Sequence, residues 1–468
     1  MIDHNDQTNQ LPNELKTVFK DLELLKHLRD ANITKNMGYS CAYLFQLVFC
    51  LIFQQKNWFR LLDSKKAEGI PAKDAVYRFL NHSKFAWRRF LLLLSAHAIS
   101  KIDKLTRKER TKVFVLDDST FSRNRSKKVE LLAHCFDHSS TTDRFYKGFR
   151  MLTLGWSDGH SFMPIDFSLL SSTKAQINGI SEDIDKRTSG YKRRMEALQT
   201  APEQIPAMLK RAVNAGIDAT YVLMDTWFTQ PPLIQAIVDQ GLDVIGMVKP
   251  TKQRYQVGNQ KVDLKALYRL ATPCQRKKEI LRSIQTTMTT TGVAIKVVFI
   301  QNRNKKSEWL AILSTDSSLT EKEIVRIYGM RWDIEVFFKA TKSLLKLQKE
   351  FQGRSYDLLI SHTTIVFARY IVLSWQNRCN TDDRTIGGLF FELCDEVSDL
   401  DWAVALQQLI ELIQDTLNKT NSTLKNLIQS QLEQWMAGLP SYINSLQWKK
   451  LRQVQLHLKC YLKNSILH

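Results

Sequence analysis

The chain has 468 residues, which is too long for one compact core and predicts two to four domains. Its hydrophobic fraction of 44% is typical of a folded globular protein and excludes a chain that is disordered throughout. The formal charge of +20 at pH 7 favours a polyanionic partner, although charge alone does not distinguish DNA from RNA or an anionic membrane.

The cysteines and the apolar segments indicate the cellular compartment that the protein occupies. Seven cysteines are scattered without CxxC pairs or a histidine partner at zinc spacing, which predicts reduced core residues in a cytosolic protein. The first sixteen residues lack the basic segment and apolar core of a secretory signal. The most apolar run, residues 38–53, is shorter than a membrane span and contains Gln46, so it predicts a buried core helix.

Residues 1–108 are expected to form a helical N-terminal domain, because Leu and Phe recur there at helical spacing. Pro71 precedes a short predicted helix that carries Lys73 and Arg78. A helical DNA-binding domain is one interpretation of this region. A purely structural helical layer is the alternative.

The pattern changes after residue 108 to short apolar runs that alternate with helical segments. This order predicts an α/β catalytic core with a mixed sheet, whose first part covers residues 109–242. The helices are expected to end at Gly216 and Gly241. The expected elements are, in order, a strand at 112–118, a hairpin at 149–170, a helix at 203–216, a strand at 220–226 and a helix at 230–241.

The remaining chain is predicted to contain three parts. Residues 243–318 return to a β pattern and are expected to form a β-rich insertion. Thr320 and Glu323 form a capping box that begins the second part of the core, residues 319–375. Residues 376–468 are predicted to be a helical C-terminal domain with a possible role in dimerisation.

Residues 328–342 (YGMRWDIEVFFKATK) combine apolar side chains with four polar ones at helical spacing. At about 100° per residue, Tyr328, Arg331, Glu335 and Lys342 lie in a stripe roughly 60° wide. The wide apolar remainder predicts a helix buried on most sides, with this stripe facing a cleft. Gly329 is expected to be able to interrupt the helix. A charge ladder on a solvated face is the alternative.

Two acidic residues end predicted strands, and a third lies in this stripe. Asp118 precedes Ser119 and Thr120, and Asp225 ends the second strand. With Glu335 they would form a site for two Mg²⁺ ions, with Mn²⁺ as a possible substitute. Two such ions about 4 Å apart can promote phosphodiester cleavage. Asp117 adjoins Asp118 and would face the opposite side of the strand, and the hydroxyl residues that follow favour Asp118.

At these residues the sequence resembles the DDE transposases of bacterial cut-and-paste insertion sequences. Tyr328, Arg331, Glu335 and Lys342 match the Tyr-x2-Arg-x3-Glu-x6-Lys motif of the insertion-sequence-four family. The resemblance covers roughly residues 110–375. It implies a ribonuclease-H-like fold with a β-rich insertion between the second Asp and the Glu. The periodicity independently indicates the β-rich insertion.

The resemblance also implies a reaction. Such an enzyme binds the terminal inverted repeats of its element, pairs the two ends as a homodimer, cleaves through a DNA hairpin and joins the 3′ ends to target DNA. It implies double-stranded DNA as the partner, a cytoplasmic, nucleoid-associated location, and neither a membrane nor a nucleotide cofactor. An aromatic residue would stack on a flipped base; Trp309 matches that position, and Trp227 is a second candidate. The expected DNA-binding residues are Tyr328, Arg331, Lys342, Trp309, Lys339, Arg123 and Arg125.

Two alternatives to a transposase have different consequences. A ribonuclease-H-like nuclease or resolvase would need the same three acids but would not join strands. A DNA-binding derivative without catalysis would not need them. His134, His138 and His160 could suggest a hydrolase with a histidine base, but no partner nucleophile accompanies them in a recognisable arrangement.

Overall fold

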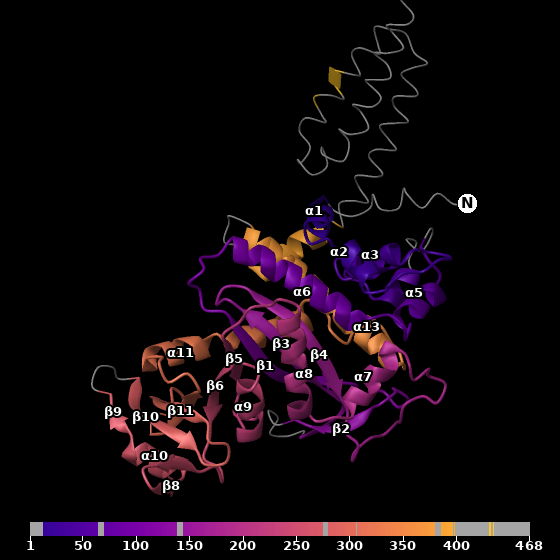
Figure 1. The fold of residues 1–468 in the computed structure, drawn as a ribbon. Helices are drawn as coiled ribbons and strands as arrows, with labels where there is room; N and C mark the ends of the chain where they lie inside the picture. The colour runs from indigo at the N-terminus through magenta and orange to yellow at the C-terminus, as the bar shows by residue number, and fades with distance from the viewer. Residues whose placement is uncertain are drawn as a thin grey trace, which may run out of the picture. The chain divides into compact units, whose positions relative to one another are not determined.

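The computed structural model describes residues 13–63, 70–137, 144–274, 279–305, 307–379, 385–395, 397, 430, 431 and 434 (Figure 1). The chain divides into two compact units. One comprises Met1–Val18, Phe53–Gln55 and Gly388–His468, and the other comprises Phe19–Ile52 and Lys56–Gly387. The second unit contains every described strand and all residues of the candidate site. Most of the expected C-terminal domain, 376–468, lies outside the described residues.

The N-terminal region is helical, as the sequence predicts. The run of apolar residues from position 38 forms α3, whose Phe45, Val48 and Phe49 are buried, so it is a core helix. α5 begins shortly after Pro71. The helices are α1 (Asn13–Asp21), α2 (Leu24–Asp30), α3 (Cys41–Cys50), α4 (Trp58–Leu62), α5 (Lys73–Leu80) and α6 (Trp87–Lys104).

The described strands form one mixed sheet in which β1 (Val113–Ser122) lies between β3 (Phe145–Ser157) and β5 (Tyr221–Met224). β1 pairs antiparallel with β3 and parallel with β5, and β5 pairs parallel with β6 (Asp243–Val248). β2 (Ala133–Phe136) and β4 (Phe162–Leu170) both pair with β3. The β3–β4 hairpin confirms the strands expected at 149–170, and Gly159 adopts a φ of +83° in its turn.

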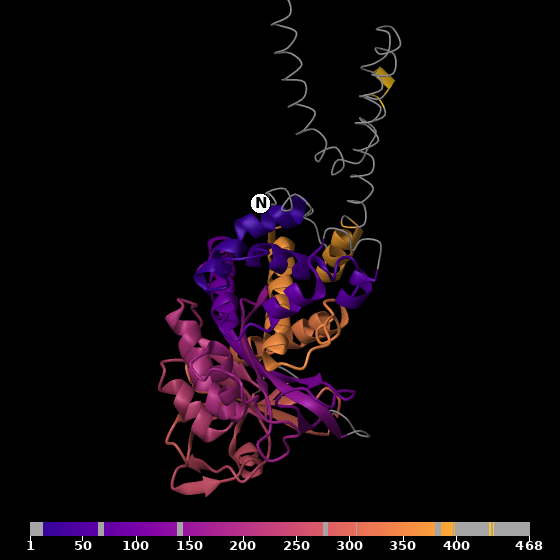
Figure 2. The same cartoon turned by 90° about the vertical axis from the view of Figure 1, so that its right-hand side faces the viewer.

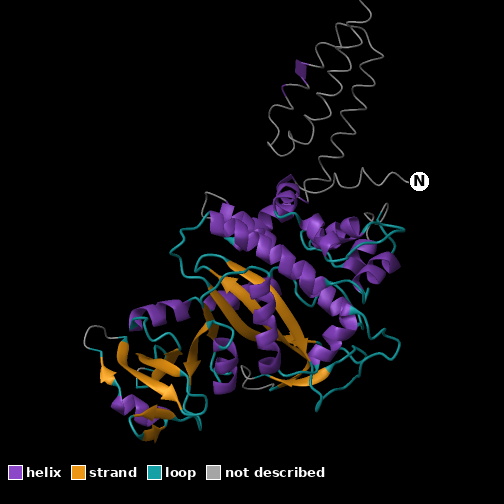
Figure 3. Ribbon diagram, in the orientation of Figure 1, coloured by secondary structure: helices purple, strands orange, loops and turns teal. Residues whose placement is uncertain are grey.

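Residues 243–318 extend the core sheet. The strand order continues from β6 through β12 (Trp309–Ser314), β11 (Ala294–Gln301) and β10 (Ile280–Met288) to two short strands. Figure 3 shows these strands beside the core sheet. The remaining elements of this region are β7 (Tyr255–Val257), β8 (Gln260–Val262), α10 (Leu264–Leu270) and β9 (Thr272–Pro273).

Helices cover both faces of the core sheet. α12 (Trp332–Ser343) and α13 (Tyr356–Cys379) pack on one face, where Phe337 of α12 contacts Phe162, and Phe367 of α13 contacts Phe167. α13 also lies beside α6 (Figures 1 and 2). In the part of the chain that the structure describes, α13 alone is long and apolar enough to cross a membrane, and it is buried within the fold. The other helices are α7 (Ser189–Ala197), α8 (Ala201–Asn214), α9 (Pro231–Val238) and α11 (Glu321–Gly329).

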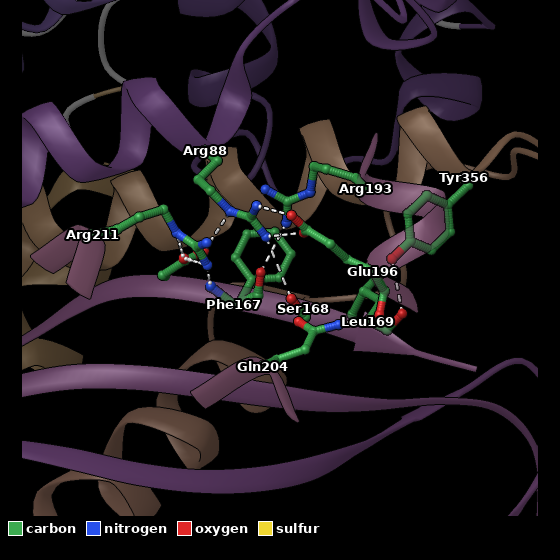
Figure 4. A network of polar contacts seen from close by, with 10 residues as sticks. Arg88, Phe167, Ser168, Leu169, Arg193, Glu196, Gln204, Arg211 and Tyr356 are labelled. Atoms are coloured by element: carbon green, nitrogen blue, oxygen red, sulfur yellow. Dashed lines mark hydrogen bonds and ion pairs between the residues drawn. The ribbon is translucent and has the colours of Figure 1, made fainter. Parts of the chain in front are cut away.

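A buried polar network fastens α6, α7 and α8 to β4 (Figure 4). Asp166 of β4 accepts hydrogen bonds from Arg88 at 3.0 Å and from Arg211 at 2.7 Å. Arg88 also binds Glu196, and Arg193 donates to the carbonyl of Phe167. Because the guanidinium groups surround Asp166, its pKa is lowered even though burial acts to raise it. The network therefore holds the helices against the sheet that carries the candidate site.

Candidate active site

Asp117 and Asp118 lie within β1 and face opposite sides of the sheet. The Oδ2 atom of Asp117 accepts a hydrogen bond from Arg331 Nη1 of α12 at 2.8 Å. Asp118 forms an ion pair with Arg150 of the neighbouring strand β3. Both carboxylates are equally covered, at 16% exposure. The motif favours Asp118, but Asp117 is the residue that faces the helix with the Tyr-Arg-Glu-Lys stripe.

Asp225 follows β5, the parallel neighbour of β1. Its Oδ1 atom accepts hydrogen bonds from the backbone amides of Trp227 at 2.9 Å and Phe228 at 3.2 Å, which fixes the carboxylate in a tight turn. Burial raises the pKa of Asp117 to about 7 against the attraction of Arg331, and the negative charge of Asp225 adds to that rise. The two acids therefore lie within electrostatic reach of each other.

The stripe residues are distributed over two helices, because α11 ends at Gly329 and α12 begins at Trp332. Arg331 is the N-cap residue of α12, and Glu335 lies one turn later. One guanidinium nitrogen of Arg331 binds Asp117, and the other binds Glu335. Since a single guanidinium bridges these carboxylates, their nearest oxygens are at most about 8 Å apart.

Lys342 and Tyr328 extend the site in two directions. The Lys342 Nζ atom donates to Ser119 Oγ at 2.6 Å and to Thr120 Oγ1 at 3.3 Å, and burial lowers the pKa of the amine. Burial also raises the pKa of the Tyr328 hydroxyl to about 12, with Arg331 acting in the opposite direction. Arg331 and Lys342 thus contact the part of β1 that carries the acids, so the stripe is not a charge ladder on a solvated face, and its position in a cleft stays a prediction.

The apolar part of α12 is narrower than the sequence predicts. Ile334, Phe337 and Phe338 are buried, but Trp332 is 61% exposed and Val336 is 46% exposed. Lys339 lies on this exposed side of the helix. The expectation of burial on most sides is therefore wrong for this strip of α12.

The other expected DNA contacts occupy different environments. Arg123 is partly buried, donates to the carbonyl of Gln348 at 2.8 Å and lies over the Phe121 ring, whereas Arg125 is exposed. Trp309 stacks on Tyr268 with ring centroids 5.0 Å apart and also contacts Phe299. His134 and His160 are exposed, and His138 lies outside the described residues.

A cavity of about 420 Å³ opens beside Asp225. Trp227, 41% exposed, lines it together with two lysines that follow β6. Arg150 lies over the same indole ring at 5.4 Å, so it links Trp227 to Asp118. Arg150 and the two lysines are far apart in the sequence, and the fold brings them together around Trp227. The lining includes Thr226, Trp227, Gln230, Lys249, Lys252 and Tyr255.

The donor set fits a hard divalent cation. Asp117, Asp225 and Glu335 offer carboxylate oxygens, and the ionised form of the partly buried Asp117 needs a neighbouring positive charge. In the described part of the chain, the three acids do not form a group whose ligand atoms all lie within 4.8 Å of one another. Arg331 bridges two of them instead. Metal binding would therefore require the Arg331 guanidinium to release at least one of these two carboxylates.

Comparison with known protein families decides the class. A family model described as DDE superfamily endonuclease matches residues 42–309, more than half of the chain. The chain belongs to the DDE superfamily endonucleases. A second family model, for archaeal transposases of the ISC1217 type, matches residues 254–366 and so includes Glu335. No curated protein shows a significant match to the chain.

The family assignment agrees with the fold. The mixed sheet with helices on both faces is consistent with the ribonuclease-H-like core of a DDE enzyme. Enzymes of this superfamily use divalent metal ions, which suits the carboxylate donors around Arg331. The two family matches support a transposase that acts on DNA.

Proposed function

We propose that this DDE endonuclease is a cut-and-paste transposase of the insertion-sequence-four type. It binds the terminal inverted repeats of its element, cleaves there through a hairpin and joins the freed 3′ ends to target DNA. The observation that carries the proposal is the convergence of Asp117, Glu335 and Arg331, with Asp225 nearby and Lys342 on the same helix. A homodimer would pair the two element ends, and the cytoplasm, at the nucleoid, is the expected location.

We assign Asp117, Asp225 and Glu335 as the metal-binding carboxylates. Two bound Mg²⁺ ions, or Mn²⁺ in their place, would activate the attacking oxygen and stabilise the leaving oxygen of a phosphodiester. The choice of Asp117 over Asp118 rests on its shared guanidinium with Glu335 and its interaction with Asp225. Asp118, paired with Arg150, would support the strand from its other face.

The positively charged side chains of the site would bind DNA phosphates. Arg331 is positioned to exchange a carboxylate for a phosphate oxygen when metal ions take over neutralisation of the acids. Lys342 would contact the phosphate that lies along Ser119 and Thr120. The Tyr328 hydroxyl stays protonated at neutral pH because its pKa is about 12, so it can donate a hydrogen bond.

Trp227 suits an unstacked base better than Trp309 does. Its ring is partly exposed at a cavity beside Asp225, and Lys249 and Lys252 line the same cavity. A base that stacks on either ring must take a free face or displace the group that covers it, and Trp227 is covered by the long side chain of Arg150 and not by another ring. Trp309 already stacks on Tyr268 within the insertion.

The test is a cleavage assay with purified protein and linear DNA that carries the element's inverted repeats. Hairpinned ends and joined products in Mg²⁺, neither of which forms in excess EDTA, would support the proposal. Nicks without joining would instead indicate a nuclease or resolvase. A retarded but intact DNA band in both conditions would indicate a DNA-binding derivative without catalysis.

A further inference from the structure

A second group of potential metal ligands lies among the N-terminal helices. Glu23, His27 and His97 each offer one ligand atom, and these atoms all lie within 4.8 Å of one another. Glu23 is the N-cap residue of α2, His27 lies in the last turn of that short helix, and His97 lies in the middle of α6. None of the three belongs to the acid site on β1.

The local backbone holds Glu23 and His27 on the same side of α2. Glu23 is the N-cap residue, and its left-handed φ of 47° is uncommon for a residue with a side chain. The His27 amide donates to the Glu23 carbonyl at 3.0 Å, which closes the first turn. Residues four apart on a helix are neighbours, so the carboxylate and the imidazole face α6 together.

The two histidines approach each other through their ring nitrogens. His27 Nε2 and His97 Nδ1 are 3.0 Å apart. Two nitrogen ligands of one tetrahedral zinc ion, each about 2.0–2.1 Å from the metal, would be separated by roughly 3.3 Å. A small adjustment of the rings would therefore accommodate an ion between them.

The protonation of the pair also suits a metal. In the contact between His27 Nε2 and His97 Nδ1, one nitrogen must accept the hydrogen bond, so at least one ring is neutral and keeps a lone pair for coordination. His27 is only 7% exposed, and its Nδ1 atom is buried without a hydrogen-bond partner among the described residues. The ring approaches His97 through its other nitrogen, Nε2, so an ion between the rings would leave Nδ1 as it is.

We propose that Glu23, His27 and His97 form a zinc site that clamps α2 to α6. Two imidazoles and one carboxylate favour Zn²⁺ over Mg²⁺, and a water would complete the tetrahedron. Lys26 Nζ binds Glu23 Oε2 at 2.6 Å, which leaves the other carboxylate oxygen for the ion. The site stabilises the helical N-terminal region and is separate from the catalytic acids.

The experiment measures Zn²⁺ binding to the full chain by calorimetry, in excess Mg²⁺ and with Asp225→Asn and Glu335→Gln present to disable the acid site. His97→Gln and Glu23→Gln test the ligands. His160→Gln is the matched control, because His160 is exposed and lies outside the group. Thermal unfolding with and without Zn²⁺ gives a second readout, since a ligand that binds only the folded chain raises Tm.

We expect one Zn²⁺ per chain in the parent, which is the chain with Asp225→Asn and Glu335→Gln, and in its His160→Gln control. Zn²⁺ should raise the Tm of both. His97→Gln should weaken binding by at least about tenfold and remove the Tm increase. If His97→Gln does not fold, the half-exposed Glu23→Gln variant decides by the same readouts. Binding well below one ion per chain, or equal binding in Glu23→Gln, His97→Gln and the control, would overturn the proposal.

Discussion

Arg331 donates a hydrogen bond to Asp117 at 2.8 Å and so joins residues 214 positions apart in the chain. The same guanidinium binds Glu335, so one cation neutralises an acid from β1 and an acid from α12. Such an arrangement keeps the acids close without bound metal, because the attraction to Arg331 offsets the cost of gathering negative charges. It also makes Arg331 the residue whose partners must change when metal ions and DNA bind.

Replacing Asp117 and Asp118 one at a time distinguishes their roles. Asp117→Asn should reduce DNA cleavage by at least about a hundredfold, because it removes a carboxylate that faces Glu335. Asp118→Asn should retain most cleavage and lower Tm, because its ion pair with Arg150 lies on the other face. Cleavage rates and filter binding of end DNA measure both effects. Loss of cleavage in Asp118→Asn alone would reverse the assignment.

Two lysines on α12 provide a matched pair. Lys342 contacts Ser119 and Thr120, whereas Lys339 lies on the exposed side of the helix. Lys342→Ala should slow cleavage by about 10- to 100-fold because a phosphate contact near the acids is lost. Lys339 is also implied as a DNA contact by the resemblance, but it lies away from Ser119 and Thr120, so Lys339→Ala should change the cleavage rate by less than about twofold. Equal rates for the two variants would show that Lys342 has no special contact with the substrate.

The sequence predicts more of the fold than of the site. Alternation and turn residues locate the β3–β4 hairpin, and the capping box at Thr320 locates the start of α11. Strand periodicity also requires Asp117 and Asp118 to face opposite sides. It does not say which side meets α12, because that depends on long-range packing of Phe162 and Phe337.

The exposed strip of α12 and the environment of Trp309 were not predictable for a similar reason. Trp332 and Val336 have the composition of core residues, yet α13 and the sheet cover only the other side of the helix. Trp309 is half-buried because Tyr268, forty-one positions earlier, folds back onto its ring. Neither contact has a local signal in the chain.

The two tryptophans should respond differently to truncation. Trp227→Ala should slow hairpin formation more than the first nick and leave Tm nearly unchanged, since its ring is partly exposed. Trp309→Ala removes an aromatic stack and should destabilise the insertion by about 1–3 kcal/mol. Gel assays that resolve nicked and hairpinned products, together with thermal unfolding, separate these outcomes. A selective hairpin defect in Trp309→Ala would restore the role that the motif implies.

A buried ion pair predicts the acid sensitivity of the fold. Arg369 of α13 binds Glu350 and donates to the carbonyls of Val48 and Phe49 of α3. Arg369→Ala should cost about 3–5 kcal/mol, measured as the free energy of unfolding in urea, because it leaves a buried carboxylate without its cation. Arg378→Ala is a suitable control, since Arg378 is more exposed and makes longer contacts.

The pH dependence follows from Glu350 and His362. Burial acts to raise the pKa of Glu350, but Arg369 and His362 lower it overall, so its contribution is complete above the ordinary value of about 4.3. That contribution is lost as the pH falls through the lowered pKa. Burial lowers the pKa of His362, so stability also decreases as the pH falls below about 6.5. Burial raises the pKa of Asp117 to about 7, which acts in the opposite direction over this range, so the test compares the parent chain with His362→Gln. A free energy of unfolding that falls equally in both chains between pH 7 and pH 5 would contradict this.

Replacement of the acids by cysteine tests the central claim, that Asp117, Asp225 and Glu335 hold the catalytic metal ions. A thiolate binds Mg²⁺ poorly but accepts softer ions such as Mn²⁺ more readily. Cleavage by Asp117→Cys should therefore be lost in Mg²⁺ and partly restored in Mn²⁺, with Asp118→Cys as the matched control that is active in both. Equal activity of Asp117→Cys in the two metals, or recovery by Mn²⁺ only in Asp118→Cys, would contradict the account.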